Sequence, residues 1–179
     1  MTKRSCSRSC PRSSAAIGPI ALSAALLAGC SSSPPVEPPA SDPCKPAGVA
    51  PEVIVGRGEF DYIPMNEGDV IQIVVPIQGG HVVWLALRQT GLLGTDSTST
   101  AKGRIDALDL DIPPSPVSYS FTPDKDGYCE LFGLPLTLPG DRPVSDMFGQ
   151  KMEVTIEVID REGTTGKGQK LVTLSDNSE

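Results

Sequence analysis

The sequence predicts an all-β protein, an antiparallel β-sandwich, because its apolar residues alternate with polar ones along several short runs. The clearest run is residues 151–160, where one face carries four apolar side chains: Met152, Val154, Ile156 and Val158. The other face carries Glu153, Thr155 and Glu157. A period of two with one apolar face is typical of a half-buried strand. Glycine, proline and aspartate separate such runs, and no convincing amphipathic helix is found among them.

Seven or eight strands are expected in a single domain over residues 52–179. The candidate runs are 59–65, 69–77, 81–90, 104–112, 117–122, 128–138, 151–160 and 169–174, and 51–55 is a further candidate. The run 81–90 is almost entirely apolar at its centre, which indicates burial on both faces. The alternation in 104–112 is broken in phase after Ala107. Glycine-rich residues 160–168 are expected to turn between the last two strands. Short strands separated by turns favour an immunoglobulin-like sandwich, with a small closed barrel as the alternative.

The N-terminal residues have the features of a secretory leader. Residues 1–14 are basic without any acidic residue, and residues 15–28 are apolar and small. The apolar run contains Pro19 and is shorter than the roughly 20 residues that span a bilayer. Residues 1–29 are therefore expected to be a signal peptide.

Residues 27–30, Leu-Ala-Gly-Cys, resemble the lipobox of bacterial lipoproteins. The resemblance implies that Cys30 is lipidated and becomes the first residue of the mature chain. Two or more acyl chains make such an anchor durable. Ser31 stands where aspartate would imply retention on the inner membrane, so the resemblance implies an outer-membrane lipoprotein on its periplasmic or cell-surface side. The alternative is an ordinary secretory leader with a chance cysteine.

Residues 30–51 are expected to be a disordered tether that begins with the lipidated cysteine. Residues 31–51 contain seven prolines and four serines and almost no large apolar side chain. Cleavage would remove Cys6 and Cys10, and lipid would consume Cys30, which leaves Cys44 and Cys129. A cysteine pair outside the cytoplasm indicates one disulfide, which would pin the end of the tether to the domain. Two free thiols are the alternative.

The charge of the mature chain excludes some partners. The leader holds four of the 15 lysines and arginines and none of the 22 acidic residues, so 11 basic residues remain against 22 acidic ones, a net charge of −11. Such a chain is not expected to bind nucleic acid or anionic lipid head groups through a basic face.

The segment QGGHVVWLALR, residues 78–88, is the most distinctive, and it contains the chain's only histidine, His81, and only tryptophan, Trp84. The stretch from EFDYIPMNEGD through QGGHVVWLALR resembles a block that recurs in uncharacterised secreted bacterial lipoproteins. This resemblance implies a location and a fold but no activity. His81 and Trp84 mark a possible functional surface. The alternatives are a histidine that hydrogen-bonds within a turn or strand edge, and a tryptophan in the core.

No catalytic motif is found. A hydrolase needs a nucleophile, a base and an orienting acid, but the chain has one histidine and no G-x-S-x-G. The sequence therefore predicts a non-enzymatic binding or scaffolding protein, held to the membrane by lipid, with a possible protein partner in the envelope and no cofactor.

The alternative function is divalent-metal binding, with calcium favoured over copper. Asp106, Asp109 and Asp111, or Asp124 and Asp126, offer the hard oxygen ligands that calcium prefers. Copper would require His81 with methionines that lack regular spacing. No metal ligand is assigned.

Overall fold

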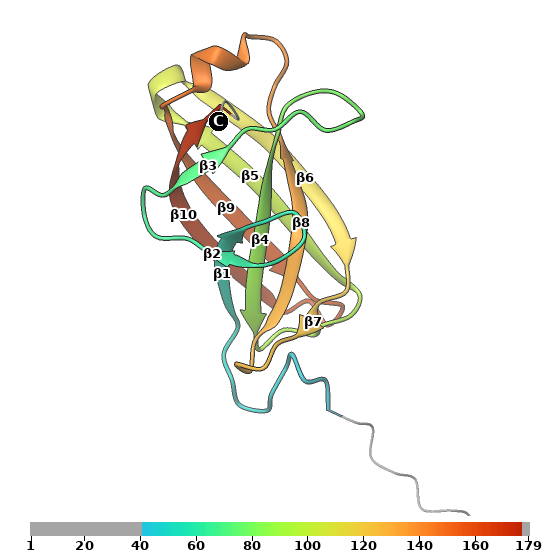
Figure 1. The fold of residues 1–179 in the computed structure, drawn as a ribbon. Coiled ribbons are helices and arrows are strands. Elements are labelled where there is room, and N and C mark those ends of the chain that lie inside the picture. The colour runs from blue at the N-terminus through green and yellow to red at the C-terminus, as the bar shows by residue number, and fades with distance from the viewer. Residues whose placement is uncertain (1–40, 177–179) are drawn as a thin grey trace, which may run out of the picture. The chain divides into compact units, whose positions relative to one another are not determined.

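Two five-stranded sheets pack face to face in the computed structural model, which describes residues 41–176 (Figure 1). The prediction of an all-β sandwich is confirmed. The strands of the first sheet are β1 Glu52–Arg57, β2 Ile63–Pro64, β4 Val82–Thr90, β7 Thr122–Pro123 and β8 Cys129–Thr137. Those of the second are β3 Val70–Gln72, β5 Ser97–Ile105, β6 Leu110–Tyr119, β9 Lys151–Ile159 and β10 Thr165–Ser175. Two short 3-10 helices, η1 Asp106–Leu108 and η2 Val144–Met147, lie in connections.

The strand order is β2-β1-β4-β8-β7 in one sheet and β3-β10-β9-β5-β6 in the other. Seven strands of the described residues are six residues or longer. The chain passes from the first sheet to the second between β4 and β5, returns to the first sheet between β6 and β8, and passes to the second again between β8 and β9. Such connections between sheets are typical of immunoglobulin-like sandwiches. All pairings are antiparallel among the named strands of residues 41–176, except that β3 pairs parallel to β10. Two open sheets, rather than one closed barrel, form the body.

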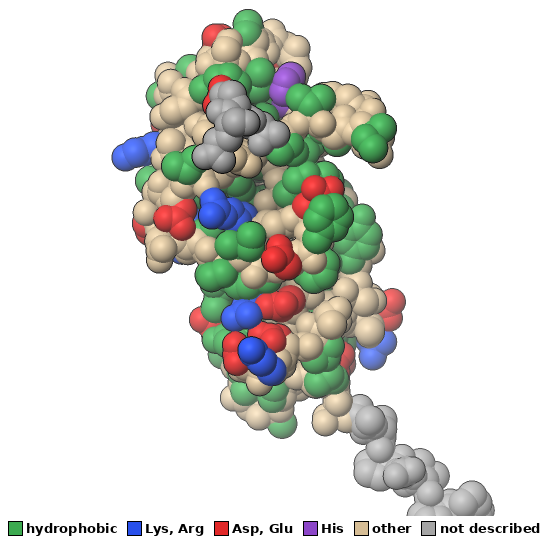
Figure 2. All heavy atoms as spheres, in the orientation of Figure 1, with side chains coloured by type: hydrophobic (Ala, Val, Ile, Leu, Met, Phe, Trp, Pro, Cys, Tyr) green, Lys and Arg blue, Asp and Glu red, His purple; other side chains and the backbone are tan. Residues whose placement is uncertain are grey.

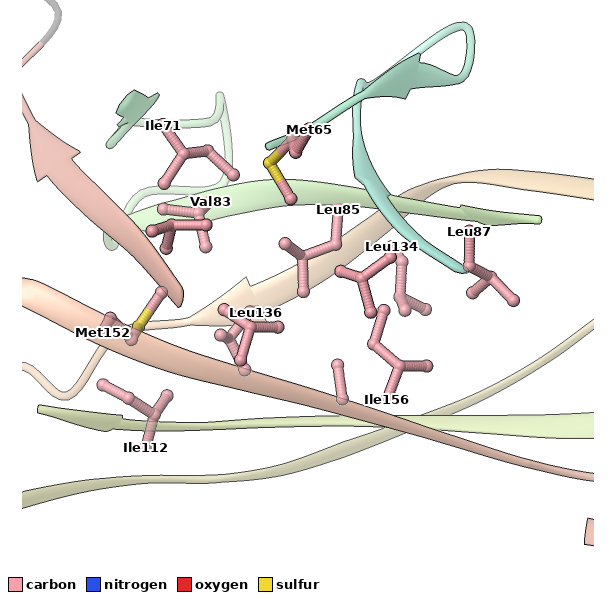
Figure 3. Packing of buried hydrophobic residues seen from close by; sticks show 14 of the residues in the cluster. Met65, Ile71, Val83, Leu85, Leu87, Ile112, Leu134, Leu136, Met152 and Ile156 are labelled. Carbon is pink, nitrogen blue, oxygen red and sulfur yellow. The ribbon is translucent and has the colours of Figure 1, made fainter. Parts of the chain in front are cut away.

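The core fills the space between the sheets (Figure 3). Val83, Leu85 and Leu87 point inward from β4, and side chains such as Leu134 and Ile156 meet them from the neighbouring β8 and the facing sheet. All five are fully buried. Burial of each such side chain contributes about 1.5–3 kcal/mol to stability. The alternation predicted for residues 151–160 holds at Met152 and Ile156, which are buried, and at Glu153, which is exposed, but Thr155 on the expected polar face is buried.

The expected strand over residues 104–112 is wrong. Those residues form the end of β5, the helix η1 and the start of β6. The break in phase after Ala107 marks this 3-10 turn. The sequence does not predict the preceding β5, because most of its inward side chains are small. Gly103 is one of these positions, and neighbouring side chains fill the space there, since an added Cβ would lie 3.0 Å from atoms of Ile112 and Met152.

The glycine-rich residues 160–168 form a turn only over their first part. β10 begins at Thr165, so Gly166 and Gly168 belong to a strand. A Cβ on Gly168 would lie 2.5 Å from the carbonyl oxygen of Val53. These glycines therefore let β10 approach β1 closely, where the edges of the two sheets meet.

Asp42, Cys44 and Lys45 lie within the range expected to be tether, yet they pack against the sandwich, whereas residues 46–51 are exposed. Cys44 is 2 % exposed, Lys45 N donates to Asp42 O at 3.0 Å, and Gly91 N donates to Cys44 O at 2.9 Å. The folded body thus begins about ten residues before Glu52, the start of β1. Residues 1–40, which include Cys30, lie outside the described residues.

Candidate binding surface

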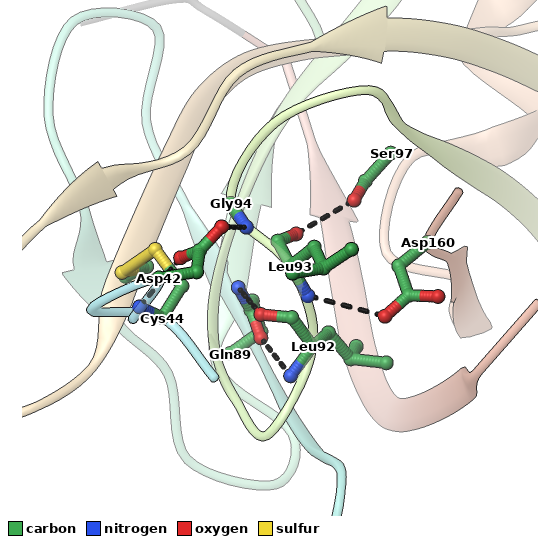
Figure 4. Close-up of a disulfide and its surroundings, with 9 residues drawn as sticks. Asp42, Cys44, Gln89, Leu92, Leu93, Gly94, Ser97 and Asp160 are labelled. Atoms are coloured by element: carbon green, nitrogen blue, oxygen red, sulfur yellow. Dashed lines mark hydrogen bonds between the residues drawn. A yellow bond between two sulfur atoms is a disulfide. The ribbon is translucent and has the colours of Figure 1, made fainter. Parts of the chain in front are cut away.

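The chain joins the sandwich at one end through a disulfide between Cys44 and Cys129 (Figure 4). The two Cα atoms are 5.4 Å apart, and 85 positions separate the cysteines in sequence. Asp42 reinforces the junction, because its carboxylate accepts hydrogen bonds from Cys44 N at 2.9 Å and Gly94 N at 3.0 Å. The predicted disulfide is present in the structure.

A buried carboxylate ties the same segment to two loops. Asp160, whose side chain is fully buried, accepts hydrogen bonds from Lys45 Nζ at 2.9 Å and Leu93 N at 3.2 Å. The amides of Glu162 and Thr164 donate to its other oxygen, each at 2.9 Å. Burial alone would raise the pKa of Asp160, but the hydrogen bonds from Lys45 and these amides outweigh it and lower the pKa from 3.8 to about 2. The carboxylate is therefore charged near neutral pH.

These contacts, with the neighbouring turn 124–128 that precedes Cys129, mark an attachment end of the body, made of residues 42–50, 91–96, 124–128 and 160–164 (Figure 1). The far end holds the loop 73–81, the turn 106–109 and the segment 138–150, which contains η2 (Figure 1). Ser41, the first described residue, lies at the attachment end, and the far end is the part of the described body most removed from it.

A groove of about 730 Å³ lies between the edges of the two sheets. We call it the edge groove, and its walls include Arg57, Glu59, Ile63, Val70, Gln72 and Trp84. Arg57 spans it, because its Nη1 donates a hydrogen bond to the carbonyl oxygen of Val70 on β3. Ile63 is 39 % exposed and Val70 is 50 % exposed. The groove therefore combines apolar side chains with charged groups from both sheets.

Trp84 faces this groove because β4 alternates. Val83 and Leu85 point into the core, so the side chain between them points outward and is half-buried. Its backbone is also fixed, since Gly58 N donates to Trp84 O at 3.2 Å. Trp84 thus lies at the surface of the protein and not in its core. Of the two interpretations of the sequence, the structure agrees with the surface position.

The segment 58–62 accounts for the burial on the outer face of β4. It runs across β4 toward β8 before returning to β2 (Figure 1), and Gly133 N donates to Gly58 O at 3.0 Å. The ring of Tyr62 lies over Gly56, where an added Cβ would be 2.4 Å from the ring, and Arg88 stacks on it at 4.5 Å. Burial raises the pKa of Tyr62, so its hydroxyl stays neutral.

His81 lies at the far end, immediately before β4. It is half-buried, and its carbonyl oxygen accepts a hydrogen bond from Leu138 N at 2.9 Å. The loop that it closes projects from the body and carries apolar side chains at the surface (Figure 2). Val75 is 67 % exposed and Ile77 is fully exposed. The structure therefore brings His81 beside an exposed apolar loop, but His81 does not line the edge groove that Trp84 lines.

The carboxylates considered as calcium ligands surround arginines. Arg104 pairs with Asp106 at 3.0 Å, with Asp109 at 2.5 Å and with Asp111 at 3.1 Å. Arg88 likewise pairs with Asp124 at 2.9 Å. Within residues 41–176, no three histidine, cysteine, aspartate or glutamate side chains form a group that could hold a metal ion.

A smaller groove of about 420 Å³ lies beside β8 and is lined by Tyr119 and Phe132, which are 51 % and 39 % exposed. Nothing in the sequence singles out these aromatic residues, or Arg57 and Ile63 of the edge groove. They come together through pairing between distant strands. Alternation along residues 128–138 does not place Phe132, because the apolar phase of Cys129 and Leu131 changes to that of Leu134 and Leu136 beside it.

A comparison with protein-family models found none that matches this chain. A comparison with curated proteins found none with significant similarity. Among the described residues, no helix is long and apolar enough to cross a bilayer.

Proposed function

We propose that this protein is a lipid-anchored component of the cell envelope that binds or scaffolds another envelope molecule without catalysing a reaction. In this proposal Cys30 carries the lipid and attaches the chain to the outer membrane, on its periplasmic or cell-surface side. The immunoglobulin-like sandwich is the binding module. Its partner is a protein of the envelope rather than nucleic acid, which the net charge of −11 disfavours.

The observation that carries the proposal is the separation of the two ends of the body. The disulfide and the Asp160 contacts fix the incoming chain at the attachment end. The exposed loop with Ile77 lies at the far end, and the edge groove opens next to β3, whose strand lies toward that end in Figure 1. An anchored protein built in this way presents the exposed loop and the edge groove away from its attachment. Exposed apolar patches of this kind mark interaction sites.

The groups that line the edge groove support binding rather than catalysis. The hydroxyl of Ser175 donates to Ile71 O at 3.5 Å, and neither histidine nor cysteine lines the groove among the described residues. A hydrolytic site would need a nucleophile next to a base. Arg57, the cation of the groove, holds β3 through the carbonyl oxygen of Val70.

The anchoring part is tested by Cys30→Ser in the cells that express the protein. We expect the wild-type protein in the membrane fraction and the variant in the soluble fraction, with a matched Cys10→Ser variant behaving as wild type. Membrane retention of Cys30→Ser would contradict the lipid anchor.

The binding part is tested by chemical cross-linking in intact cells, followed by mass spectrometry of what purifies with the protein. We expect a dominant envelope protein, and its yield should fall in an Ile77→Asp variant but not in Lys125→Asp at the attachment end. Recovery of the same background proteins with the wild type and with both variants would contradict a binding role. Calcium or copper that raises the melting temperature would instead favour the metal-binding alternative.

A further inference from the structure

The outer edge of β3 opens into the edge groove. β3 is the last strand of its sheet, and Val70, Gln72 and the following Val74 line the groove. On the other side of the groove lie Arg57 and Ile63, which belong to the opposite sheet. The groove is therefore bounded by a sheet edge on one side and by side chains on the other.

The register of β3 turns the backbone groups that do not pair with β10 toward the groove. Thr173 N on β10 donates to Asp69 O at 2.9 Å, and Ile73 N donates to Ser175 O on β10 at 2.8 Å. In a parallel ladder with this register, residues 69, 71 and 73 bond to β10. The N–H and C=O groups of Val70 and Gln72 then point away from β10. The carbonyl oxygen of Val70 accepts a hydrogen bond from Arg57. The N–H groups of Val70 and Gln72 and the carbonyl group of Gln72 are therefore the ones directed into the groove.

Size and side chains suit a short extended segment. The volume of about 730 Å³ falls within the range of ligand sites, roughly 300–1,000 Å³. Val70, Ile63 and the half-buried Trp84 give an incoming strand apolar surfaces on which alternate side chains can pack. When a strand adds to a sheet edge, the main chain supplies hydrogen bonds and such side-chain pockets supply specificity.

Charge indicates the kind of segment. The residues that line the groove include two acidic side chains, Glu59 and Asp176, and one basic side chain, Arg57. The mature chain as a whole carries 22 acidic and 11 basic residues. A segment with lysine or arginine beside its apolar residues is therefore complementary to this surface.

We propose that the edge groove binds an extended, basic-flanked segment of another protein, which adds to the outer edge of β3 as an extra strand. This inference rests on the proposed binding function and names the partner's chemistry. The tether of the chain itself is a poor occupant, because residues 31–51 hold seven prolines, which lack the N–H that strand addition uses. A second copy of the chain is disfavoured as the occupant. In each copy Arg57 and Ile63 lie across the groove from the β3 edge, so they screen that edge from the β3 edge of another copy.

The probe is a displayed library of random linear heptapeptides, selected on the purified full chain. We expect enriched peptides with alternating apolar residues and a flanking lysine or arginine. Synthetic copies should bind with micromolar affinity and slow the amide hydrogen exchange of Val70 and Gln72. No peptide that binds, or binding that leaves both amides unprotected, would overturn the inference.

Two substitutions at Gln72 separate the contribution of its backbone N–H to peptide binding from the contribution of its side chain. Gln72→Pro removes the N–H that faces the groove, and proline is tolerated on an edge strand where that N–H points outward. Gln72→Ala keeps the N–H and removes the side chain. We expect Gln72→Pro to weaken peptide binding about tenfold, the loss of one or more hydrogen bonds, and Gln72→Ala to bind nearly as wild type. Equal binding by the two variants would contradict strand addition.

N-methylated peptides provide a test that does not depend on folding of the proline variant. Methylation of the peptide amides along one edge should abolish binding, and methylation along the other edge should leave it unchanged. Equal effects on both edges would count against strand addition. A dimer in analytical ultracentrifugation that Gln72→Pro dissociates would also overturn the inference, because a second copy would then occupy the edge.

The outcome is separable from that of the proposed function. If no peptide binds but Ile77→Asp still reduces recovery of an envelope protein from cells, the strand-addition inference fails and the binding function stands. If peptides bind at β3 but no cellular partner is recovered, the proposed function fails.

Discussion

Asp160 is the residue on which the attachment end most depends. It accepts hydrogen bonds from the incoming segment through Lys45, from the β4–β5 loop through Leu93, and from its own turn through Glu162 and Thr164. Asp160→Asn keeps the shape but removes the charge and places an amide near these donors. We expect a loss of about 1–3 kcal/mol in the free energy of unfolding at pH 7, measured by urea denaturation. The exposed Asp141→Asn is the control and should change stability little.

The same residue predicts a pH dependence. Because folding lowers the pKa of Asp160 from 3.8 to about 2, its charged form favours the native state. This contribution is fully present above about pH 4 and is lost as the pH falls from 4 to 2. The difference in melting temperature between wild type and Asp160→Asn should therefore shrink over that range. A difference that is constant from pH 7 to 2 would show that the charge of Asp160 does not stabilise the fold.

At the scale of elements, β10 depends on glycines that face β1. An added Cβ on Gly168 would lie 2.5 Å from the carbonyl oxygen of Val53, and backbone there cannot move without disturbing the β1–β4 pairing. We expect Gly168→Ala to lower the free energy of unfolding by about 1–3 kcal/mol. Gly140→Ala, where nothing lies within 4 Å of the added Cβ, is the matched control for thermal denaturation. Similar melting temperatures for the two variants would contradict the close approach of β10 to β1.

The elements that the sequence predicts well are those with a continuous apolar face, one face in residues 151–160 and both faces in residues 81–90. Residues 151–160 and 81–90 form β9 and β4, because alternation and apolar content report burial directly. β5 was not predictable in this way, since Gly103 and Ala101 face the core and neighbouring side chains fill the space that they leave. Gly166 and Gly168 of β10 suggest a turn when only the sequence is considered. The structure shows that they lie in a strand and face β1, a contact that leaves no local pattern in the sequence.

The candidate surface was less predictable than the fold. The segment QGGHVVWLALR did direct attention to Trp84, which lines the edge groove, and to His81, which closes the exposed loop. The other walls, Arg57, Ile63 and Val70, come from strands of different sheets. Their proximity depends on sheet packing and on the parallel β3–β10 pairing, which leave no local pattern in the sequence.

For the whole molecule, the disulfide should contribute a large share of stability. It closes a long loop between the incoming segment and β8, and such a bridge stabilises by roughly 2–5 kcal/mol. We expect dithiothreitol to lower the melting temperature of the wild type. The Cys44→Ser/Cys129→Ser double variant should melt at the reduced value and not respond to dithiothreitol. An unchanged melting temperature of the wild type after reduction would contradict this role.

In the proposed function, the sandwich binds its partner away from the end at which the chain enters. The most direct measurement places a photo-cross-linking amino acid at single positions of the full chain in intact cells. We expect adducts with one envelope protein from Ile77 and Glu59, near the exposed loop and the edge groove, and none from Lys125 at the attachment end. Adducts from Lys125 alone, or the same weak background from all three positions, would contradict it.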